Sequence, residues 1–413
     1  VAEWRERDAV KWARLLGGLV LGWIGDSHGR TLSLRISIAV MTAGALAMVV
    51  IPANSFGVYS LGCPATVLLI IVRIALAFSA GGEMVGSLLF MAESAPPKSK
   101  FLATSIPVAA ASLGTGIAHV VSAIIQRCLS DRARELYGWR LAFLLGLPVG
   151  FAGFALRSHV GESQAFAGAA KKFRARHPKE HPFAFALRQD PLRLLVFCAL
   201  TMVACGFVGA ASWYQGDWLE TFYTEHLSQK GRNLTAVQAK VLNTLILFGP
   251  SAGGTLATAW AVDSSPGMAN IPSHCLMMMS AMLIIVASPI NLLWMSRGTE
   301  CLACVTLAQA GQVLCSAPAT AALATHLAVA VPRQLQFTSM ALAYNAGLAI
   351  FGHTMPTVAS AIHQRMNDAN GLLAATAPAL YLSSLAAVAL GSLILTCLPS
   401  VKQMRQDFEL AVS

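Results

Sequence analysis

The feature that most constrains this chain is the number and length of its uncharged stretches. Nine windows contain no Asp, Glu, Lys or Arg, and together they hold 253 of the 413 residues. These windows are residues 36–72, 101–126, 141–156, 194–216, 241–262, 264–296, 301–332, 334–364 and 369–401. A helix needs about 20 apolar residues to cross the hydrocarbon core of a bilayer. The sequence therefore predicts an all-α integral membrane protein whose main partner is the lipid bilayer.

The composition excludes several other classes of protein. Charged residues make up 12% of the chain, about half of what a soluble surface carries. The net charge of +10 is typical of basic loops on the cytoplasmic side of a membrane, so no nucleic-acid partner is expected. The sequence contains no nucleotide-binding loop, no nucleophile–base pair and no cluster of metal ligands. We therefore expect neither an enzyme nor a cofactor or metal site.

The apolar runs predict about eleven membrane-spanning helices. They lie near residues 13–25, 36–56, 65–91, 102–125, 139–157, 192–214, 238–261, 273–296, 301–328, 336–360 and 374–398. The stretch 157–193 carries eight basic residues against three acidic ones, which predicts a cytoplasmic position. We expect an N-terminal bundle over residues 1–160, a cytoplasmic central loop over 161–190 and a C-terminal six-helix bundle over 191–413.

The two halves carry related sequences at matching points. Gly17 to Arg30 reads GGLVLGWIGDSHGR, and Gly253 to Gly267 reads GGTLATAWAVDSSPG, so that Asp26 aligns with Asp263. Such a repeat is typical of transporters built from duplicated helical units. Residues 1–12 hold six charged side chains and are not expected to span lipid. The pattern therefore predicts twelve helices with the first one missing from the chain.

The first copy of the repeat has a mechanical interpretation. Small residues let two helices pack closely, and a carboxylate at a helix end can bind an arginine or the N-terminus of a neighbouring helix. A latch of this kind would hold one access state of a transporter. The pattern resembles the loop motif of the major facilitator superfamily in Arg14, Gly17, Gly18, Gly22, Gly25, Asp26, Gly29 and Arg30.

Further motifs resemble one branch of that superfamily, the metabolite:proton symporter family, which includes proline/betaine, α-ketoglutarate, citrate and shikimate transporters. The stretches are Arg73 to Glu83, Glu93 to Pro96, Gly138 to Gly146, Leu156 to Phe166, and Arg333 with Ala343 to Pro356. Leu15, Gln164 and His353 depart from the family's usual pattern. The resemblance implies two pseudo-symmetric helical bundles in a multi-pass protein of the bacterial inner membrane. It implies a monomer that couples protons to the movement of a small metabolite.

Ionisable residues inside a span are costly and are kept where they face a cavity or a partner. We expect Arg73 to bind a substrate carboxylate and Glu83 to carry the proton, although each could instead form a structural ion pair. The expected substrate and proton pathway comprises Arg73, Glu83, His119, Tyr344, Asn345 and His353. The expected cytoplasmic gate comprises Arg14, Gly22, Asp26, Gly29, Arg30, Glu93, Arg157, Glu162 and Arg333. Packing roles for the histidines and solvated charges at the gate are the alternatives.

Two functions fit these observations. The first is a proton-coupled symporter for a small carboxylate or a zwitterionic osmolyte such as proline, betaine or α-ketoglutarate. The alternative is a degenerate or sensor-like membrane protein of the same fold that does not transport. The alternative is favoured by the absent first helix, by His353 and by the loss of basic residues after Asp263 in the second copy of the repeat.

Overall fold

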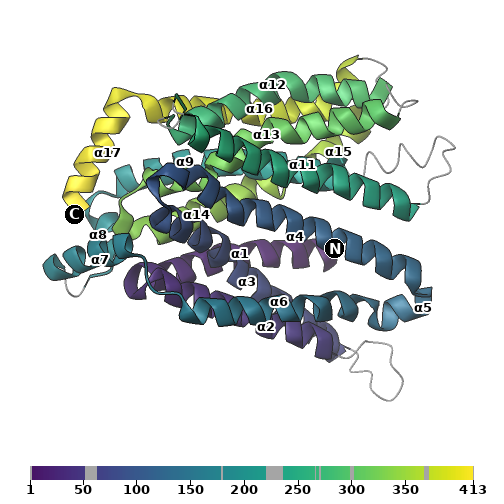
Figure 1. The fold of residues 1–413 in the computed structure, drawn as a ribbon, viewed down its shortest axis with the longest axis horizontal. Helices are drawn as coiled ribbons and strands as arrows, with labels where there is room; N and C mark the ends of the chain where they lie inside the picture. The colour runs from purple at the N-terminus through teal and green to yellow at the C-terminus, as the bar shows by residue number, and fades with distance from the viewer. Residues whose placement is uncertain are drawn as a thin grey trace.

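The computed structural model describes residues 2–51, 63–177, 180–219, 236–265, 267–268, 271–297, 302–366 and 372–412, and these residues form helices and turns with no strand among them. The first half contains α1 (Ala2–His28), α2 (Arg30–Val50), α3 (Cys63–Ser94), η2 (Pro97–Ser99), α4 (Lys100–Cys128), α5 (Asp131–Ala133), η3 (Arg134–Gly138) and α6 (Trp139–His159). Two shorter helices, α7 (Gln164–Arg176) and α8 (Pro182–Gln189), link the halves. We call them the linker helices (Figure 1).

The second half continues in the same all-helical manner. It contains α9 (Pro191–Trp213), η4 (Tyr214–Leu219), α11 (Ala236–Ser264), α12 (Ser273–Arg297), α13 (Leu302–Ala330), η5 (Arg333–Leu335), α14 (Gln336–Gly347), η6 (Leu348–Gly352), α15 (Met355–Met366), α16 (Leu372–Cys397) and α17 (Pro399–Val412). Within the described ranges, nine helices are long and apolar enough to cross a membrane. The predicted all-α membrane protein is confirmed.

Three predicted segments differ in detail from the structure. The run expected at 13–25 belongs to α1, which is already helical from Ala2. The span expected at 336–360 is interrupted by the π-helical turn η6, where the His353 amide donates to the Leu348 carbonyl. The stretch 161–190, expected to be a loop, contains α7 and α8. The last two differences reflect local hydrogen bonds, at η6 and at the N-terminal caps of α7 and α8, that hydropathy alone does not report.

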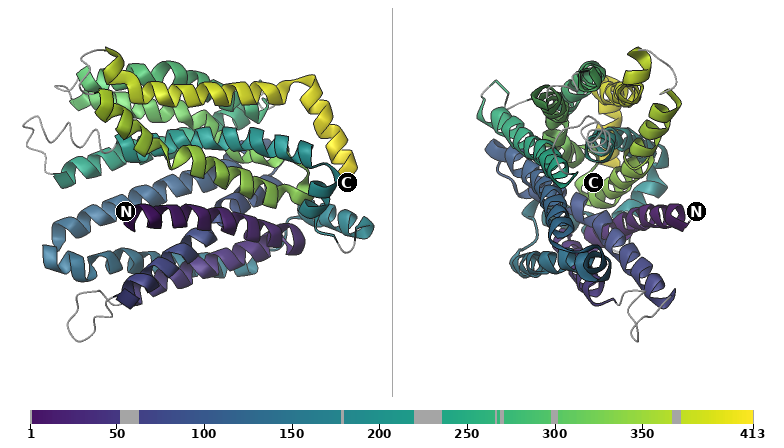
Figure 2. Two further views of the ribbon diagram at one scale, coloured as in Figure 1. Left: turned by 180° about the vertical axis from the view of Figure 1, so that it is seen from behind. Right: turned by 90° about the vertical axis from the view of Figure 1, so that its right-hand side faces the viewer.

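The helices of the two halves gather into two groups that lie side by side (Figure 2). Within the first group α3 packs against α1 and α2, and α2 packs against α6. The two groups meet along two seams, where α1 packs against α14 and α4 packs against α11. A cavity between the halves can be closed or opened by forming or separating the contacts at these seams.

Close backbone contact holds α1 against α3. A Cβ atom added to Gly81 would lie 2.0 Å from the Arg14 carbonyl oxygen and 2.6 Å from the Gly18 nitrogen. Only glycine allows backbones to approach so closely, as is common between helices in lipid. The crossing therefore fixes the position of Arg14 relative to α3.

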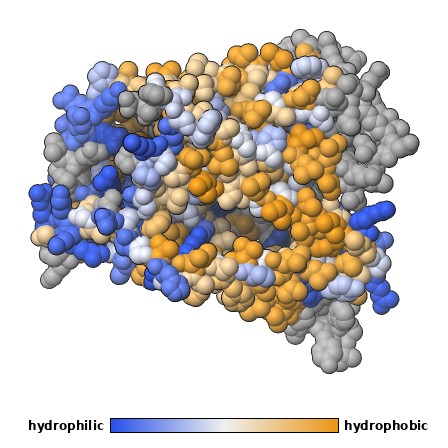
Figure 3. Space-filling view, viewed as in Figure 1, coloured by the Kyte–Doolittle hydropathy of each residue, from blue (hydrophilic) through white to orange (hydrophobic). Residues whose placement is uncertain are grey.

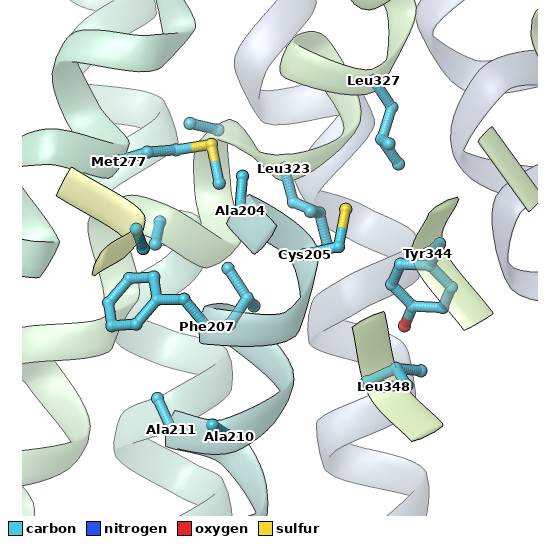
Figure 4. Close-up of a cluster of buried hydrophobic side chains, with 14 of the residues drawn as sticks. Ala204, Cys205, Phe207, Ala210, Ala211, Met277, Leu323, Leu327, Tyr344 and Leu348 are labelled. Carbon is cyan, nitrogen blue, oxygen red and sulfur yellow. The ribbon is translucent and has the colours of Figure 1, made fainter. Parts of the chain in front are cut away.

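The core of the second half is built around α9. Ala204, Cys205, Ala210 and Ala211 are almost fully buried, and small side chains let neighbouring helices approach this one closely. Figure 4 shows these residues beside Met277 of α12 and residues of α13 and α14. Helix α9 therefore packs against α14, the helix that forms a seam with α1.

The surface separates into an apolar middle and a polar end. Apolar side chains cover the middle of the face seen in Figure 3, and hydrophilic side chains gather at the end that carries α7 and α8. We call this end the linker end. The short helix α5 lies at the opposite end of the bundle.

Candidate functional site

A latch between α1 and α14 is centred on Asp26. The Asp26 side chain is buried and lies near the C-terminal end of α1. Its carboxylate accepts hydrogen bonds from the backbone N–H groups of Phe337 (3.1 Å) and Thr338 (2.8 Å), and from the Thr338 hydroxyl (2.6 Å). The first N–H groups of a helix lack partners within the helix and carry partial positive charge. Asp26 therefore binds the two halves together at the N-terminus of α14.

Arg30 completes this first latch and has no exposed surface. Its guanidinium forms an ion pair with Asp26 and a second one with Glu93 at 3.3 Å, and it donates to the Arg333 carbonyl oxygen at 3.0 Å. Glu93 also accepts a 2.6 Å hydrogen bond from the Ser163 hydroxyl. The cluster thus joins α1, α2, α3 and the segments before α7 and α14. A buried charge network of this kind is stable only while all its members are present.

Two glycines of the motif have specific geometric roles. A Cβ atom at Gly22 would lie 2.7 Å from the Thr338 Cα atom, so Gly22 lets α1 approach α14. Gly29 has a φ of 122°, a conformation that favours glycine, and a Cβ there would lie 2.3 Å from Glu162 Oε2. Glu162 itself accepts hydrogen bonds from the N–H and hydroxyl of Thr31 at 3.2 and 3.1 Å. The predicted Gly, Asp, Arg and Glu residues therefore lie together at the linker end.

A second latch stands at the other seam, at the position that the sequence repeat indicates. Asp263, near the end of α11, accepts hydrogen bonds from the N–H groups of Phe101 (3.3 Å) and Leu102 (2.7 Å) at the start of α4. Asp26 and Asp263 thus each bind the N-terminus of a helix in the opposite half of the chain. The missing basic residues of the second copy do not prevent this contact, because its partner is backbone.

Three predicted gate residues take other positions. Arg333 contributes its carbonyl oxygen to Arg30, and its side chain is exposed. Arg157 forms an ion pair with Glu83 instead of joining the first latch. Arg14 lies fourteen positions before the end of α1, about 20 Å along the helix axis, and it lines the central cavity described next.

The central cavity has a volume of about 350 Å³ and is lined by residues from both halves of the chain. Arg14 is the one Lys or Arg among the described residues that line it. The polar and aromatic lining consists of Ser112, Thr115, His119, Ser212, Trp213, Gln215, Phe248, Ser251, Ser316, Thr320 and Tyr344. A cavity with apolar and aromatic walls and a few polar groups is the usual form of a small-molecule site.

The predicted pathway residues divide between the cavity and its surroundings. His119 and Tyr344 line the cavity, and the His119 ring packs against Phe248 at a centroid distance of 5.4 Å. His353 packs against Trp213 at 4.5 Å, one residue removed from the lining. Arg73 is exposed on α3 and is not part of the cavity lining.

Asn345 is buried and joins three helices. Its amide nitrogen donates to the carbonyl oxygens of Gly81 and Ala341, both at 2.8 Å. Its side-chain oxygen accepts from Arg14 Nε at 3.1 Å. Asn345 therefore lies behind the cavity wall and orients the guanidinium of Arg14.

Glu83 lies between α2, α3 and α6. It forms an ion pair with Arg157 and accepts a hydrogen bond from the Ser37 hydroxyl. Arg157 also lines a smaller cavity of about 270 Å³, together with Thr31 and other residues toward the linker end. The ion pair that the sequence left open as an alternative is therefore present, with Arg157 as the partner.

Sequence reasoning missed several residues of the site. Trp213, Gln215, Phe248 and Ser316 line the cavity without any local motif, because their grouping depends on how four separate helices pack. Asp263 could have been found, since the internal repeat aligns it with Asp26.

Comparison with known proteins gives consistent matches. The family described as "Sugar (and other) transporter" matches residues 9–178. The ectoine/proline transporter ProP of Corynebacterium glutamicum is 25% identical over 408 residues, which are 96% of this chain and 75% of that protein. A Staphylococcus aureus protein named for proline/betaine transport is 29% identical over 57% of this chain and 47% of its own length. The chain thus spans less than half of that second relative.

Among solved structures, the proton:xylose symporter XylE bound to 6-bromo-6-deoxy-D-glucose has a TM-score of 0.72 at 15% identity. The match covers 98% of this chain and 88% of that one. At this identity the likeness concerns the fold alone. The two helical groups, the paired latches and these matches define a multi-pass membrane protein with the fold of secondary transporters. The chain therefore has the major facilitator fold, and the proteins that it resembles include ones named as transporters of proline, betaine and ectoine.

Proposed function

We propose that this protein is a secondary active transporter that moves a small metabolite through the central cavity. The observation that carries the proposal is the placement of this cavity between the two halves, with both seams latched at the linker end. Opening the Asp26 and Asp263 latches at that end would expose the cavity to the other side of the membrane. This is the alternating access that two pseudo-symmetric bundles can perform.

The proposed substrates are small zwitterions that carry a carboxylate and an ammonium group. The names of the two relatives specify ectoine, proline and betaine. A cavity with one arginine, three aromatic side chains and several hydroxyls suits such a molecule. Metabolic carboxylates such as α-ketoglutarate form the second class to test. The proposed location is the bacterial inner membrane, with the linker end in the cytoplasm and a monomer as the working unit.

Proton coupling is assigned to Glu83. Three carboxylates lie in the nine apolar spans of the described chain, namely Glu83, Glu93 and Asp263. Glu93 and Asp263 belong to the latches, which leaves Glu83 for exchange with solvent. The small cavity beside Arg157 provides space between this ion pair and the linker end. Separation of the pair during the transport cycle would let Glu83 take up and release a proton.

One of the three observations that favour the non-transporting alternative is the loss of basic residues after Asp263, and it does not remove the second latch. The second copy of the repeat has no basic residues after Asp263, yet Asp263 still holds the N-terminus of α4. The loss of basic residues therefore does not abolish the contact between Asp263 and α4.

Uptake into proteoliposomes tests the proposed function. With an inward proton gradient, the purified protein should accumulate at least one of proline, glycine betaine and ectoine. A protonophore should return the internal concentration to the external level. The control is protein-free liposomes with the same gradient. A folded protein that binds and accumulates none of these compounds, nor α-ketoglutarate, citrate or shikimate, would contradict the proposal.

A further inference from the structure

Arg14 fixes the position of the positive charge in the wall of the central cavity. Arg14 Nε donates to Asn345, and Asn345 is in turn fixed by the carbonyl groups of Gly81 and Ala341. The backbone of Arg14 is also fixed, because its carbonyl group lies at the glycine crossing of α1 and α3. The position and the orientation of this guanidinium are therefore fixed in the absence of a ligand.

The terminal nitrogens of Arg14 remain available to the cavity. Among the described residues, the structure records one hydrogen bond from this side chain, through Nε, and no carboxylate within ion-pair distance. A guanidinium held at Nε presents Nη1 and Nη2 as a parallel pair of donors, which matches the two oxygens of a carboxylate. Binding a ligand there would not require an existing ion pair to break.

We propose that Arg14 binds the carboxylate of the transported molecule and that Asn345 is the residue that positions it. This deepens the proposed function and rests on it. It replaces the expectation that Arg73 is the anchor, since Arg73 lies outside the cavity lining. The aromatic side chains of Trp213 and Phe248 line the same cavity and suit the cationic end of a zwitterion.

The test compares two ligands that differ at the carboxylate. Glycine betaine and choline share a trimethylammonium group, and choline carries a hydroxyl in place of the carboxylate. Charge-assisted hydrogen bonds of about 1.5 to 3 kcal/mol correspond to a preference of about 10- to 100-fold for betaine. In Arg14→Gln this preference, measured as a ratio of Kd values in one preparation, should fall to near unity, and Asn345→Ala should reduce it partly.

The ratio remains informative when a variant is less stable, because both ligands then bind the same folded fraction. Arg73→Gln is the matched control and should keep the full preference. An unchanged ratio in Arg14→Gln, or a ratio lost in Arg73→Gln instead, would overturn the assignment of Arg14. If the unaltered protein binds none of proline, ectoine, glycine betaine, α-ketoglutarate, citrate and shikimate, the proposed function itself fails, and the assignment fails with it.

A separate observation concerns how the linker helices attach to α1. The ring of His181 stacks on Trp23 with a centroid distance of 3.4 Å and an interplanar angle of 7°. His181 Nε2 lies 3.1 Å from the Trp23 carbonyl oxygen, and Arg174 of α7 donates to the Ser27 carbonyl oxygen. The linker therefore binds the last two turns of α1, and Arg174 contacts Ser27, one of the last four residues, whose carbonyl groups lack partners within the helix.

These contacts define the protonation state of His181. Its Nδ1 accepts a 3.2 Å hydrogen bond from the Phe183 N–H and so caps the N-terminus of α8. Its Nε2 must carry the hydrogen that is donated to the Trp23 carbonyl. Both bonds are satisfied only by the neutral ring with its hydrogen on Nε2. A second proton would occupy Nδ1 and face the Phe183 N–H, donor against donor.

The charged and titratable groups around His181 come from three segments. Asp26 and His28 approach it from α1, Arg174 from α7, and Glu180 from the connection between the linker helices. Burial is the largest effect and lowers the pKa of His181, against the Trp23 hydrogen bond and Asp26, which raise it. Because the bound pKa lies below the value of the released ring, the contact is complete above about pH 6.5. It weakens as the pH falls below that value.

We infer that α7 and α8 form a pH-sensitive strap that releases α1 when the solution at the linker end becomes acidic. The strap borders the first latch, since Asp26 and His181 line one cavity of about 510 Å³. Release would free the end of α1 that carries Asp26. A proton-coupled importer would thereby sense protons that accumulate on this side.

Hydrogen exchange of the full chain in nanodiscs tests the strap. Protection of the amides from Phe183 to Ala186 should fall by about three- to tenfold between pH 7.5 and 5.5, after correction for intrinsic exchange rates. His181→Asn keeps an N-cap residue without a titratable ring, so it should remove this pH response. His177→Gln is the control and should retain it. A response that persists in His181→Asn, or its absence in the unaltered protein, would overturn the inference.

Discussion

Arg30→Met is expected to destabilise the protein by about 3 to 5 kcal/mol, because it leaves buried carboxylates without their cation. Asp26 would keep its contacts with α14, but Glu93 would face a buried environment with no arginine beside it. The apparent melting temperature of the detergent-solubilised protein should fall steeply. The seam between α1 and α14 should also become accessible to solvent in the state described here.

Arg35→Met is the matched control on the same helix. Arg35 donates to the carbonyl groups of Arg157 and Val160, both at 2.9 Å, and has no acidic partner within ion-pair distance among the described residues. Its loss should cost about 1 kcal/mol. Equal falls in melting temperature for the two variants would show that the charge network contributes no more than ordinary hydrogen bonds.

Glu83→Gln is expected to abolish accumulation driven by a proton gradient while preserving exchange of substrate across the membrane. A glutamine keeps the size of the side chain and the hydrogen bond with Ser37 but cannot release a proton. The accumulation ratio in proteoliposomes should therefore fall to one. Counterflow of labelled substrate should continue at a rate close to that of the unaltered protein.

The ion pair with Arg157 requires a second variant, because Glu83→Gln also leaves that arginine without its partner. In Glu83→Gln/Arg157→Gln both charges are removed, so the stability lost by the single variant should return in part. If the role of the pair is structural, the double variant should regain accumulation together with stability. A stable double variant that exchanges but does not accumulate substrate would instead support the proton role.

Part of the first latch could be predicted from sequence because Asp26 and Arg30 belong to one short motif, whereas Glu93 comes from α3. Asp26, Gly29 and Arg30 lie at the junction of α1 and α2, where the short spacing of residues determines their geometry. The same reasoning placed Arg14 in the gate, since Arg14 is the first residue of the same motif. It failed because one helix passes from the linker end to the cavity, and distance along that helix changes the environment of each residue.

The sequence indicated several site residues, but it did not indicate which other residues they contact. The ion pair of Glu83 with Arg157 and the clamp of Asn345 on Arg14 join segments that are far apart in the chain. Hydropathy identifies which segments become spans, but it does not specify which faces meet. Those pairings are decided by packing, as at the glycine contact between α1 and α3.

The two latches have a consequence for how this sequence can vary. In each latch one partner is a single aspartate side chain, while the other includes backbone N–H groups of Phe337 and Thr338 or of Phe101 and Leu102. Every residue type except proline supplies such a group. The receiving helix ends can therefore accept many substitutions without losing these bonds, whereas Asp26 and Asp263 have few replacements. At each seam, the helix that donates its N–H groups should therefore tolerate more substitutions than the aspartate that accepts them.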